Sequence, residues 1–266
     1  MKSAIIQFKI DPQESIDQTM KRMSQKLDEC RDADLIVLPE MWAVGYYSFD
    51  EYAAHAETEN GPVISFLKRK AKELHAYIAG GSIVERDGGR LYNTLFFLSP
   101  DGHVAAKYRK QYMVGFDSRE AELLTAGDST TTIRTEFGVI GFAICYDLRF
   151  PELFRTMVDD GVDYIIVTAA WAFPRIEHWL TLCKARAIEN VCYVLACNSS
   201  GAEHGKTYFG HSMILDPWGT ILASGGCEEA VIRTETDKHT VSQIRAVFPP
   251  VQDRWNKLAD KHCITA

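Results

Sequence analysis

The chain has 266 residues, and its 29 Lys and Arg against 36 Asp and Glu give a formal net charge of −7. This balance argues against nucleic acid as a partner, because phosphate binding draws on concentrated positive charge. With 46% hydrophobic and 24% charged residues, the composition is typical of a globular protein rather than a disordered or fibrous one. At this size about 70% of the unfolded surface can be buried, so the core is large enough without disulfides or metals.

The sequence carries no apolar run near the roughly 18 residues of a membrane span. The apolar stretch within residues 1–12 is also too short for a secretory signal. Seven cysteines are an odd number and form no C-x-x-C pair, which argues against a disulfide framework or a zinc site. We therefore expect a cytoplasmic protein without a metal or a membrane partner, in which most cysteines are small buried residues.

Strand and helix patterns alternate along the first half of the chain. The apolar residues Ile16, Met20, Met23 and Leu27, spaced by four, three and four, indicate one face of a helix. The other elements expected here are a strand at 3–8, a buried strand at 35–38, a helix after Gly61-Pro62, and strands near 77–82, 91–98 and 103–107.

The second half repeats this alternation. The apolar run at 139–145 predicts a strand, and Pro151 predicts the first turn of the helix that follows. Next come a strand at 164–168, a helix at 178–190, a strand at 191–198 and a turn at 216–219 that separates two late strands. No linker or repeat divides the sequence, so we expect one α/β domain over residues 1–266, with two sheets face to face and helices outside.

Three polar residues stand where buried strands end. Cys145 closes the apolar run, Glu40 follows the strand at 35–38, and Lys110 follows a strand with a basic end. Side chains at strand ends are held on rigid backbone, at the edge where ligands of α/β sheets bind. Each has an ordinary alternative, because a buried cysteine usually serves packing and charged residues after strands are usually solvated.

Taken together, these segments resemble the carbon–nitrogen hydrolase (nitrilase) superfamily. The matching motifs are Leu38-Pro39-Glu40, Tyr108-Arg109-Lys110 and Cys145-Tyr146-Asp147-Leu148-Arg149-Phe150-Pro151-Glu152. Supporting segments are Gly80-Gly81-Ser82-Ile83, Tyr92-Asn93-Thr94, Lys184-Ala185-Arg186-Ala187 and Gly210-His211-Ser212. The resemblance covers most of the chain. It implies a four-layer α-β-β-α sandwich, a homodimer or higher homo-oligomer built through outer helices, and hydrolysis of a non-peptide C–N bond without a cofactor.

The resemblance also implies catalytic roles. Glu40 takes the proton of Cys145 and the sulfur attacks the amide carbon, and a thioester forms when ammonia leaves. Glu40 then protonates the departing ammonia and activates the water that hydrolyses the thioester. The Lys110 ammonium and the backbone N–H of Tyr146 are the expected donors to the oxyanion.

A second active-site glutamate of the family lies seven residues before a glycine turn. Counting back from Gly127 gives Glu120, which we expect to hold Lys110 and to help position the substrate. Glu122, at five residues, is the alternative. Many relatives have His two positions after the lysine, where this chain has Tyr112, and the stretch at 110–127 is shorter than in many amidases. The pocket rim is therefore expected to differ.

The cysteine motif and the His178-Trp179 pair resemble the ω-amidase-like branch, which releases ammonia from small dicarboxylate monoamides such as 2-oxoglutaramate. Such a pocket must neutralise a carboxylate, and a guanidinium does so in a bidentate way. Arg175, after the strand at 164–168, is the candidate, against the alternative of a surface arginine in a loop. N-carbamoyl hydrolysis is the nearest other activity, and nitrile hydrolysis is more distant.

Two other classes of function compete with an amidase of this kind. A Cys–His hydrolase would pair Cys145 with His178 or His211. His178 also suits a helix start, and His211 a buried strand position bonded to backbone. A binding module without activity would have no use for the glutamate, lysine and cysteine together. Replacing each histidine, and measuring ammonia release, separates these alternatives from an enzyme that acts on a small-molecule amide.

Overall fold

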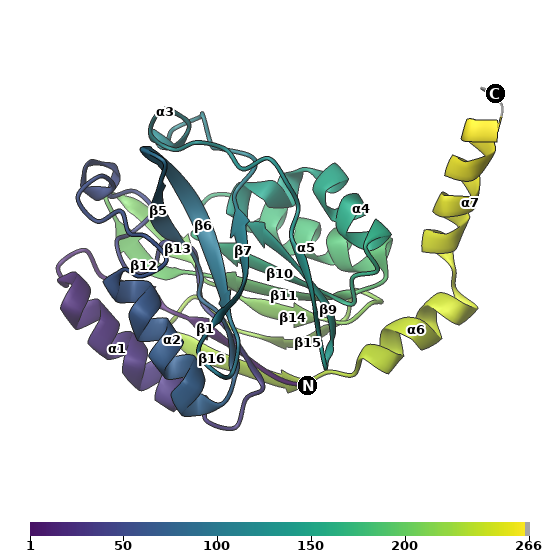
Figure 1. Ribbon diagram of the computed structural model, residues 1–266, viewed down its shortest axis with the longest axis horizontal. Helices are drawn as coiled ribbons and strands as arrows, with labels where there is room; N and C mark the ends of the chain where they lie inside the picture. The colour runs from purple at the N-terminus through teal and green to yellow at the C-terminus, as the bar shows by residue number, and fades with distance from the viewer. Residues whose placement is uncertain (264–266) are drawn as a thin grey trace.

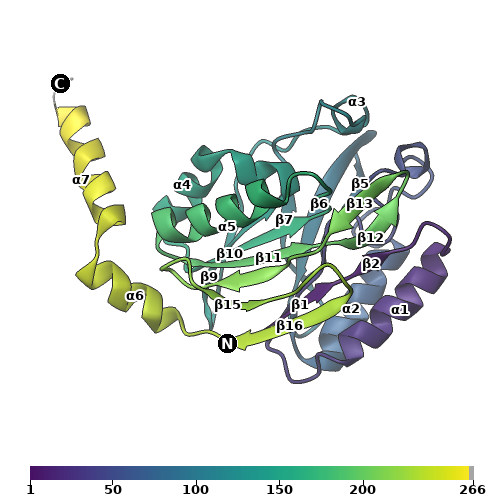
Figure 2. The same cartoon turned by 180° about the vertical axis from the view of Figure 1, so that it is seen from behind.

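The computed structural model describes the backbone of residues 1–263 and the side chains of residues 1–259. Two large sheets pack face to face (Figures 1 and 2). The first has seven strands: β1 (Lys2–Gln7), β3 (Leu35–Val37), β4 (Tyr77–Ala79), β5 (Ile83–Asp87), β6 (Arg90–Leu98), β7 (Val104–Arg109) and β16 (Ala230–Glu235). The second has six: β8 (Thr132–Thr135), β9 (Gly138–Ile144), β10 (Tyr164–Ala169), β11 (Tyr193–Asn198), β14 (Met213–Leu215) and β15 (Ile221–Ser224).

Helices cover the outer face of each sheet. α1 (Ile16–Asp28) and α2 (Pro62–Leu74) lie on the first sheet, and α4 (Pro151–Asp159) and α5 (Ile176–Asn190) lie on the second (Figure 1). α1 begins with a capping box between Ser15 and Gln18 and buries Met23 and Leu27, two of the residues expected on its apolar face. The four-layer α-β-β-α sandwich is confirmed.

The core between the sheets is aromatic and aliphatic. Phe97 of the first sheet and Phe142 of the second have ring centroids 5.1 Å apart, and both side chains are fully buried. Burial of a large apolar side chain is worth roughly 1.5–3 kcal/mol. The packing of one sheet on the other therefore holds their strand ends in a fixed relation.

Parallel pairing brings the functional strand ends together within each sheet. β3 pairs in parallel with β1 and β4, and β9 pairs in parallel with β10, which is itself parallel to β11. The carboxyl ends of β3 and β9 lead directly into Glu40 and Cys145. These two residues therefore come from different sheets and meet at one end of the sandwich.

Several elements were not predicted from the sequence. These are β5, β8 and β16 of the two large sheets, a small sheet of β2 (Lys9–Ile10), β12 (Ser200–Glu203) and β13 (Lys206–Phe209), the short helices η1 (Phe49–Glu51), η2 (Cys145–Arg149) and α3 (Glu120–Leu123), and the C-terminal helices α6 (Lys238–Val247) and α7 (Pro250–Cys263). α6 and α7 extend away from the sandwich as an arm (Figure 1). No helix within residues 1–263 is both long and apolar enough to cross a bilayer. The single domain over residues 1–266 stays a prediction.

Candidate active site

Cys145 lies at the turn from β9 into a short 3-10 helix, η2 (Cys145–Arg149). All seven residues of β9 are buried, so the strand is rigid where it ends. Cys145 has a φ of 50°, a left-handed conformation that a non-glycine residue adopts at a cost of about 1–3 kcal/mol. Its side chain lines a cavity of about 350 Å³. Strain of this kind is typical of a side chain held for function.

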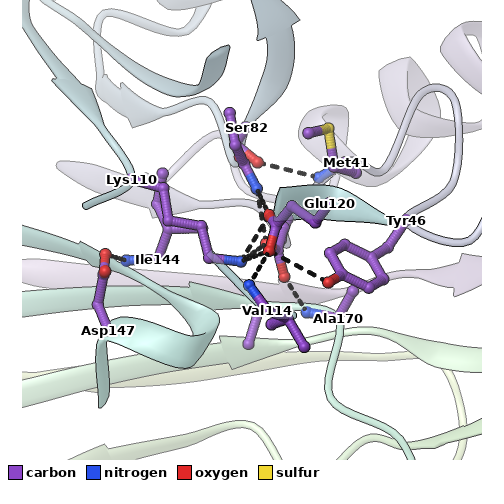
Figure 3. Close-up of polar contacts among 12 residues, drawn as sticks. Met41, Tyr46, Ser82, Lys110, Val114, Glu120, Ile144, Asp147 and Ala170 are labelled. Atoms are coloured by element: carbon purple, nitrogen blue, oxygen red, sulfur yellow. Dashed lines mark hydrogen bonds and ion pairs between the residues drawn. The ribbon is translucent and has the colours of Figure 1, made fainter. Parts of the chain in front are cut away.

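Glu40 follows β3 and is fully buried. The amide of Asn93 donates to Glu40 Oε1 at 2.8 Å, and the backbone N–H of Ala170 donates to Oε2 at 2.9 Å. The next residue, Met41, has a φ of 50°, and Ser82 contacts its backbone N–H (Figure 3). Donors from both sheets therefore fix the orientation of this carboxylate.

Lys110 lies between two carboxylates. Its Nζ is 3.0 Å from Glu40 Oε1 and 2.7 Å from Glu120 Oε1, and all three side chains are fully buried. Glu120 Oε2 accepts from the backbone N–H of Val114 at 2.9 Å and from the Tyr46 hydroxyl at 3.2 Å (Figure 3). The cluster of one cation and two carboxylates carries a net negative charge.

The charges of this cluster set its protonation states. Burial alone lowers the pKa of Lys110, but the Glu120 and Glu40 carboxylates outweigh it and hold this pKa well above its ordinary value. Burial and the Glu40 carboxylate raise the pKa of the Cys145 thiol well above its ordinary value, against an opposite effect of Lys110. The lysine is therefore a permanent cation and the resting cysteine is a thiol, so attack by the sulfur needs a base.

The structure separates the two glutamates that the sequence left as alternatives. Glu120 begins α3 and binds Lys110 directly. Glu122, two residues on, is exposed and pairs with Arg119 at 3.3 Å. The count back from Gly127 therefore selected the residue that lies in the buried cluster.

Asp147 is a buried residue of this region that sequence reasoning did not single out. Its Oδ2 accepts from the Tyr108 hydroxyl at 2.7 Å and from the backbone N–H of Ile144 at 2.9 Å, and its Oδ1 accepts from the Tyr112 N–H at 3.0 Å. Burial raises the pKa of this carboxyl to about 6. Asp147 connects the turn at Cys145 to the strand before Lys110. Its place inside the cysteine motif was the available signal.

Both residues expected to contact substrate line the cavity beside Cys145. Tyr146 follows the cysteine directly, and Arg175 stands at the start of α5. A second guanidinium, that of Arg149, also lines this cavity, with its Cζ 4.8 Å from the centre of the Trp171 ring. Sequence reasoning named Arg149 only as part of a motif. The cavity therefore presents two guanidinium groups near the cysteine.

The two histidines of the Cys–His alternative contact other groups. His178 lies near the start of α5 as expected, and its Nδ1 is 3.3 Å from Arg149 Nη2. The expected buried strand position of His211 was wrong. The residue lies between β13 and β14 with a φ of 51°, and its Nε2 is 3.6 Å from the exposed thiol of Cys227. Each histidine therefore contacts a group other than Cys145, as expected if neither is the base for this cysteine.

Among the described residues, no group of three or more His, Cys, Asp or Glu side chains is arranged to hold a metal ion.

Residues 2–246 match the family described as carbon-nitrogen hydrolase. The chain belongs to this family. A 2-oxoglutaramate amidase of Paenarthrobacter nicotinovorans is 34% identical, over 94% of this chain and 88% of the relative. An omega-amidase of Homo sapiens is 33% identical, over 96% and 95%.

Solved structures agree with this assignment. A nitrilase-superfamily protein of Saccharomyces cerevisiae has a TM-score of 0.84 at 30% identity, covering 94% of each chain. A carbon–nitrogen hydrolase superfamily protein of Xanthomonas campestris, with an arsenic adduct in its active site, has a TM-score of 0.89 at 27% identity, covering 95% of this chain and 96% of its own. The expected family is confirmed.

Proposed function

We propose that this protein is an ω-amidase that releases ammonia from a small 2-oxo dicarboxylate monoamide. Its general class, an amidohydrolase acting on a non-peptide C–N bond, follows from the family. The observation that carries the narrower proposal is the pair of guanidinium groups, Arg149 and Arg175, in the cavity beside Cys145. The relatives named as 2-oxoglutaramate amidase and omega-amidase support the same substrate class.

In the proposed reaction Glu40 removes the proton of Cys145 as the sulfur attacks the amide carbon. The base has to act during attack because the resting cysteine is a thiol. The C–N bond then breaks, Glu40 returns the proton to the leaving nitrogen, and ammonia departs from a thioester. Water attacks the thioester, again with Glu40 as base. The carboxylate product is released and the Cys145 thiol is restored.

The oxyanion of both steps is assigned to Lys110 and to the backbone N–H of Tyr146. An ammonium has three N–H donors, and Glu40 and Glu120 accept from Lys110 on one side. In this structure Glu40 Oε1 and both oxygens of Glu120 accept from Lys110 Nζ, so we assign the N–H directed at Glu120 Oε2, at 2.9 Å, to the substrate oxygen in the complex. Glu120 touches the cation rather than the thiol, so we assign it to holding Lys110 in place and charged.

An assay for released ammonia tests the substrate class. Monoamides of 2-oxo dicarboxylates, N-carbamoyl amines and aliphatic nitriles are compared at equal concentration. The proposal predicts that the 2-oxo monoamides have the highest kcat/KM. A preference for N-carbamoyl amines would replace the proposal with the N-carbamoyl amidohydrolase alternative.

We also propose that the protein is a cytoplasmic homodimer. The six cysteines whose side chains are described are all free, which suits a reducing compartment. An exposed apolar patch, consisting of Ile188, Trp218, Val247 and Phe248, lies where α5 meets the C-terminal arm. A second copy of the chain is the proposed occupant of this C-terminal apolar patch.

A further inference from the structure

One buried carboxylate outside the Glu40–Lys110–Glu120 cluster contacts a turn that shapes it. Glu203 ends β12 and is 2% exposed. Its Oε1 accepts from the backbone N–H of Tyr47 at 2.9 Å and from the Tyr208 hydroxyl, and its Oε2 accepts from the Ser48 hydroxyl at 3.3 Å. Within the described part of the chain, Glu203 takes part in no ion pair.

A buried carboxylate without a cation is costly unless hydrogen bonds compensate it. Two of the three donors to Glu203 belong to one turn, residues 45–48. Gly45 in this turn has a φ of +92°, and a Cβ at that position would lie 2.1 Å from Glu203 Oε2. Only glycine permits this close approach, so the turn and the carboxylate fit each other specifically.

The turn carries two side chains, Tyr46 and Tyr47, that both line the active-site cavity. The Tyr46 hydroxyl donates to Glu120 Oε2 at 3.2 Å, and its ring centre is 5.4 Å from Lys110 Nζ (Figure 3). Tyr47 lines the cavity that contains Cys145, and its ring stacks on that of Tyr208 at 6.2 Å. A shift of the turn would therefore move both the lysine cluster and the cavity wall.

We propose that Glu203 is a positioning residue for the amidase reaction. It acts through the 45–48 turn, by fixing Tyr46 against the Glu120–Lys110 pair and Tyr47 in the wall of the substrate cavity. This inference rests on the proposed function, because it assigns Lys110 and Glu120 to catalysis. Glu203 itself contacts no substrate atom; its effect depends on the reach of its side chain to the backbone of Tyr47 rather than on its charge.

Two conservative variants separate reach from charge. E203Q keeps the side-chain length, so its amide oxygen can still accept from the Tyr47 N–H and its NH2 can donate to Ser48. E203D keeps the charge but is one methylene too short. We expect E203Q to stay within about threefold of the wild-type kcat/KM. We expect E203D to lose roughly 10- to 100-fold, the scale of a misplacement near 1 Å. The opposite order would overturn the proposal.

Glu57 supplies a matched control. Its carboxylate accepts from the backbone N–H of Val63 at 3.0 Å, and a Cβ on Gly61 would lie 2.4 Å from it, so it binds a glycine-containing segment as Glu203 does. Glu57 does not line the cavity that contains Cys145. E57Q and E57D are expected to change thermal stability while kcat/KM stays within about twofold of wild type. If E203D, like E57D, lowered thermal stability but left kcat/KM unchanged, Glu203 would have only a structural role.

Coupling to Tyr46 is the decisive measurement. If Glu203 acts through this turn, part of its effect is already lost in Y46F. The fold loss in kcat/KM caused by E203D should then be less than a third as large in the Y46F background as in the wild type. Independent, multiplicative losses would overturn the proposal. Wild-type enzyme is assayed first with the 2-oxo monoamide. Failure of the wild type to release ammonia would reject the proposed function, whereas failure of the variant pattern in an active wild type rejects only the role of Glu203.

Discussion

At the scale of single residues, the site combines a protonated thiol, a permanent cation and carboxylates held in fixed orientations. Cys145 and Lys110 both have raised pKa values, but for different reasons. Burial and the Glu40 carboxylate disfavour the thiolate, whereas Glu120 and Glu40 stabilise the ammonium against the effect of burial. The same carboxylates therefore keep Lys110 protonated and charged, and keep Cys145 a neutral thiol in the resting site.

Replacement of Cys145 by alanine tests the nucleophile. Cys145→Ala removes one sulfur atom, so we expect hydrolysis to be abolished while thermal stability stays close to that of the wild type. Mass spectrometry of the wild type after acyl-enzyme trapping should place the adduct on Cys145 and on none of the other six cysteines. Ammonia release at the wild-type rate by correctly folded Cys145→Ala would exclude the thioester mechanism.

The two neighbouring glutamates provide a matched pair. Glu120→Gln removes a carboxylate that binds Lys110, and we expect a loss of more than about 100-fold in kcat, the scale of a disrupted oxyanion donor. Glu122→Gln removes only an exposed contact with Arg119 and should change kcat less than twofold. Steady-state ammonia release measures both, and equal losses would show that the Glu120–Lys110 contact has no special part in catalysis.

Charge in the cavity should decide substrate selectivity. Arg175→Met retains a long unbranched apolar stem but removes the guanidinium. KM for a 2-oxo dicarboxylate monoamide should therefore rise about tenfold or more. KM for an uncharged aliphatic amide should stay nearly constant. Equal losses on both substrates would indicate structural damage, and no loss on either would remove Arg175 from the site.

At the scale of elements, sequence patterns predicted the parts that carry their own signal. α1 has a clear apolar face and a capping box, and β9 is an uninterrupted apolar run, so both were expected near their observed positions. The hairpin of β12 and β13 is short and pairs with the two-residue strand β2 and, through an isolated bridge, with Ala172, which leaves little periodicity to read. α7 was missed although Val251, Trp255 and Leu258 recur at helical spacing, and Val251 is buried.

The site shows the same division. Glu40, Lys110 and Cys145 follow strands and carry recognisable motifs, so their proximity could be predicted from the sequence. The contact of Tyr46 with Glu120 joins residues 74 positions apart, and the contact of Tyr108 with Asp147 joins residues 39 apart. Long-range hydrogen bonds of this kind depend on packing between the sheets, and no local pattern encodes them.

Asp147 links β7, β9 and η2, and its titration should appear in the stability of the fold. Its pKa is raised from 3.8 to about 6 by burial. Because the pKa is higher in the folded than in the unfolded chain, the protonated Asp147 side chain contributes to the free energy of unfolding. This contribution is fully present below about pH 4 and is lost as the pH rises through about 6. The shift corresponds to about 3 kcal/mol. Relative to Asp147→Asn, the wild type should therefore lose about that much free energy of unfolding between pH 4 and pH 7.

Urea unfolding at both pH values measures this difference. Any constant effect of the asparagine on the three hydrogen bonds cancels when the two pH values are compared. A difference in the free energy of unfolding between wild type and Asp147→Asn that does not change with pH would show that Asp147 has the same protonation behaviour in the folded and unfolded chains.

At the scale of the whole molecule, the four-layer sandwich leaves a group of neighbouring apolar residues exposed where the C-terminal arm begins. The C-terminal apolar patch contains Val247 at 79% exposure, Trp218 at 52% and Phe248 at 47%, with the Trp218 and Phe248 ring centroids 5.5 Å apart. Arg254 and Trp255 of α7 bind Asp159 of α4, which anchors the arm to the sandwich. The patch is therefore held in place although it is exposed in the single chain.

If a second copy covers this patch, replacing Val247 and Phe248, two adjacent residues of the patch, with serine should weaken the dimer. Removing two apolar side chains from an interface costs about 3 kcal/mol or more, which corresponds to at least about a 100-fold rise in the dimer dissociation constant. Sedimentation equilibrium of Val247→Ser/Phe248→Ser measures that rise directly. Phe116→Ser is the control, because Phe116 is 81% exposed but lies on the rim of the active-site cavity. A dissociation constant unchanged in both variants would place the interface elsewhere on the molecule, and equal weakening in both would show that loss of any exposed aromatic residue has this effect.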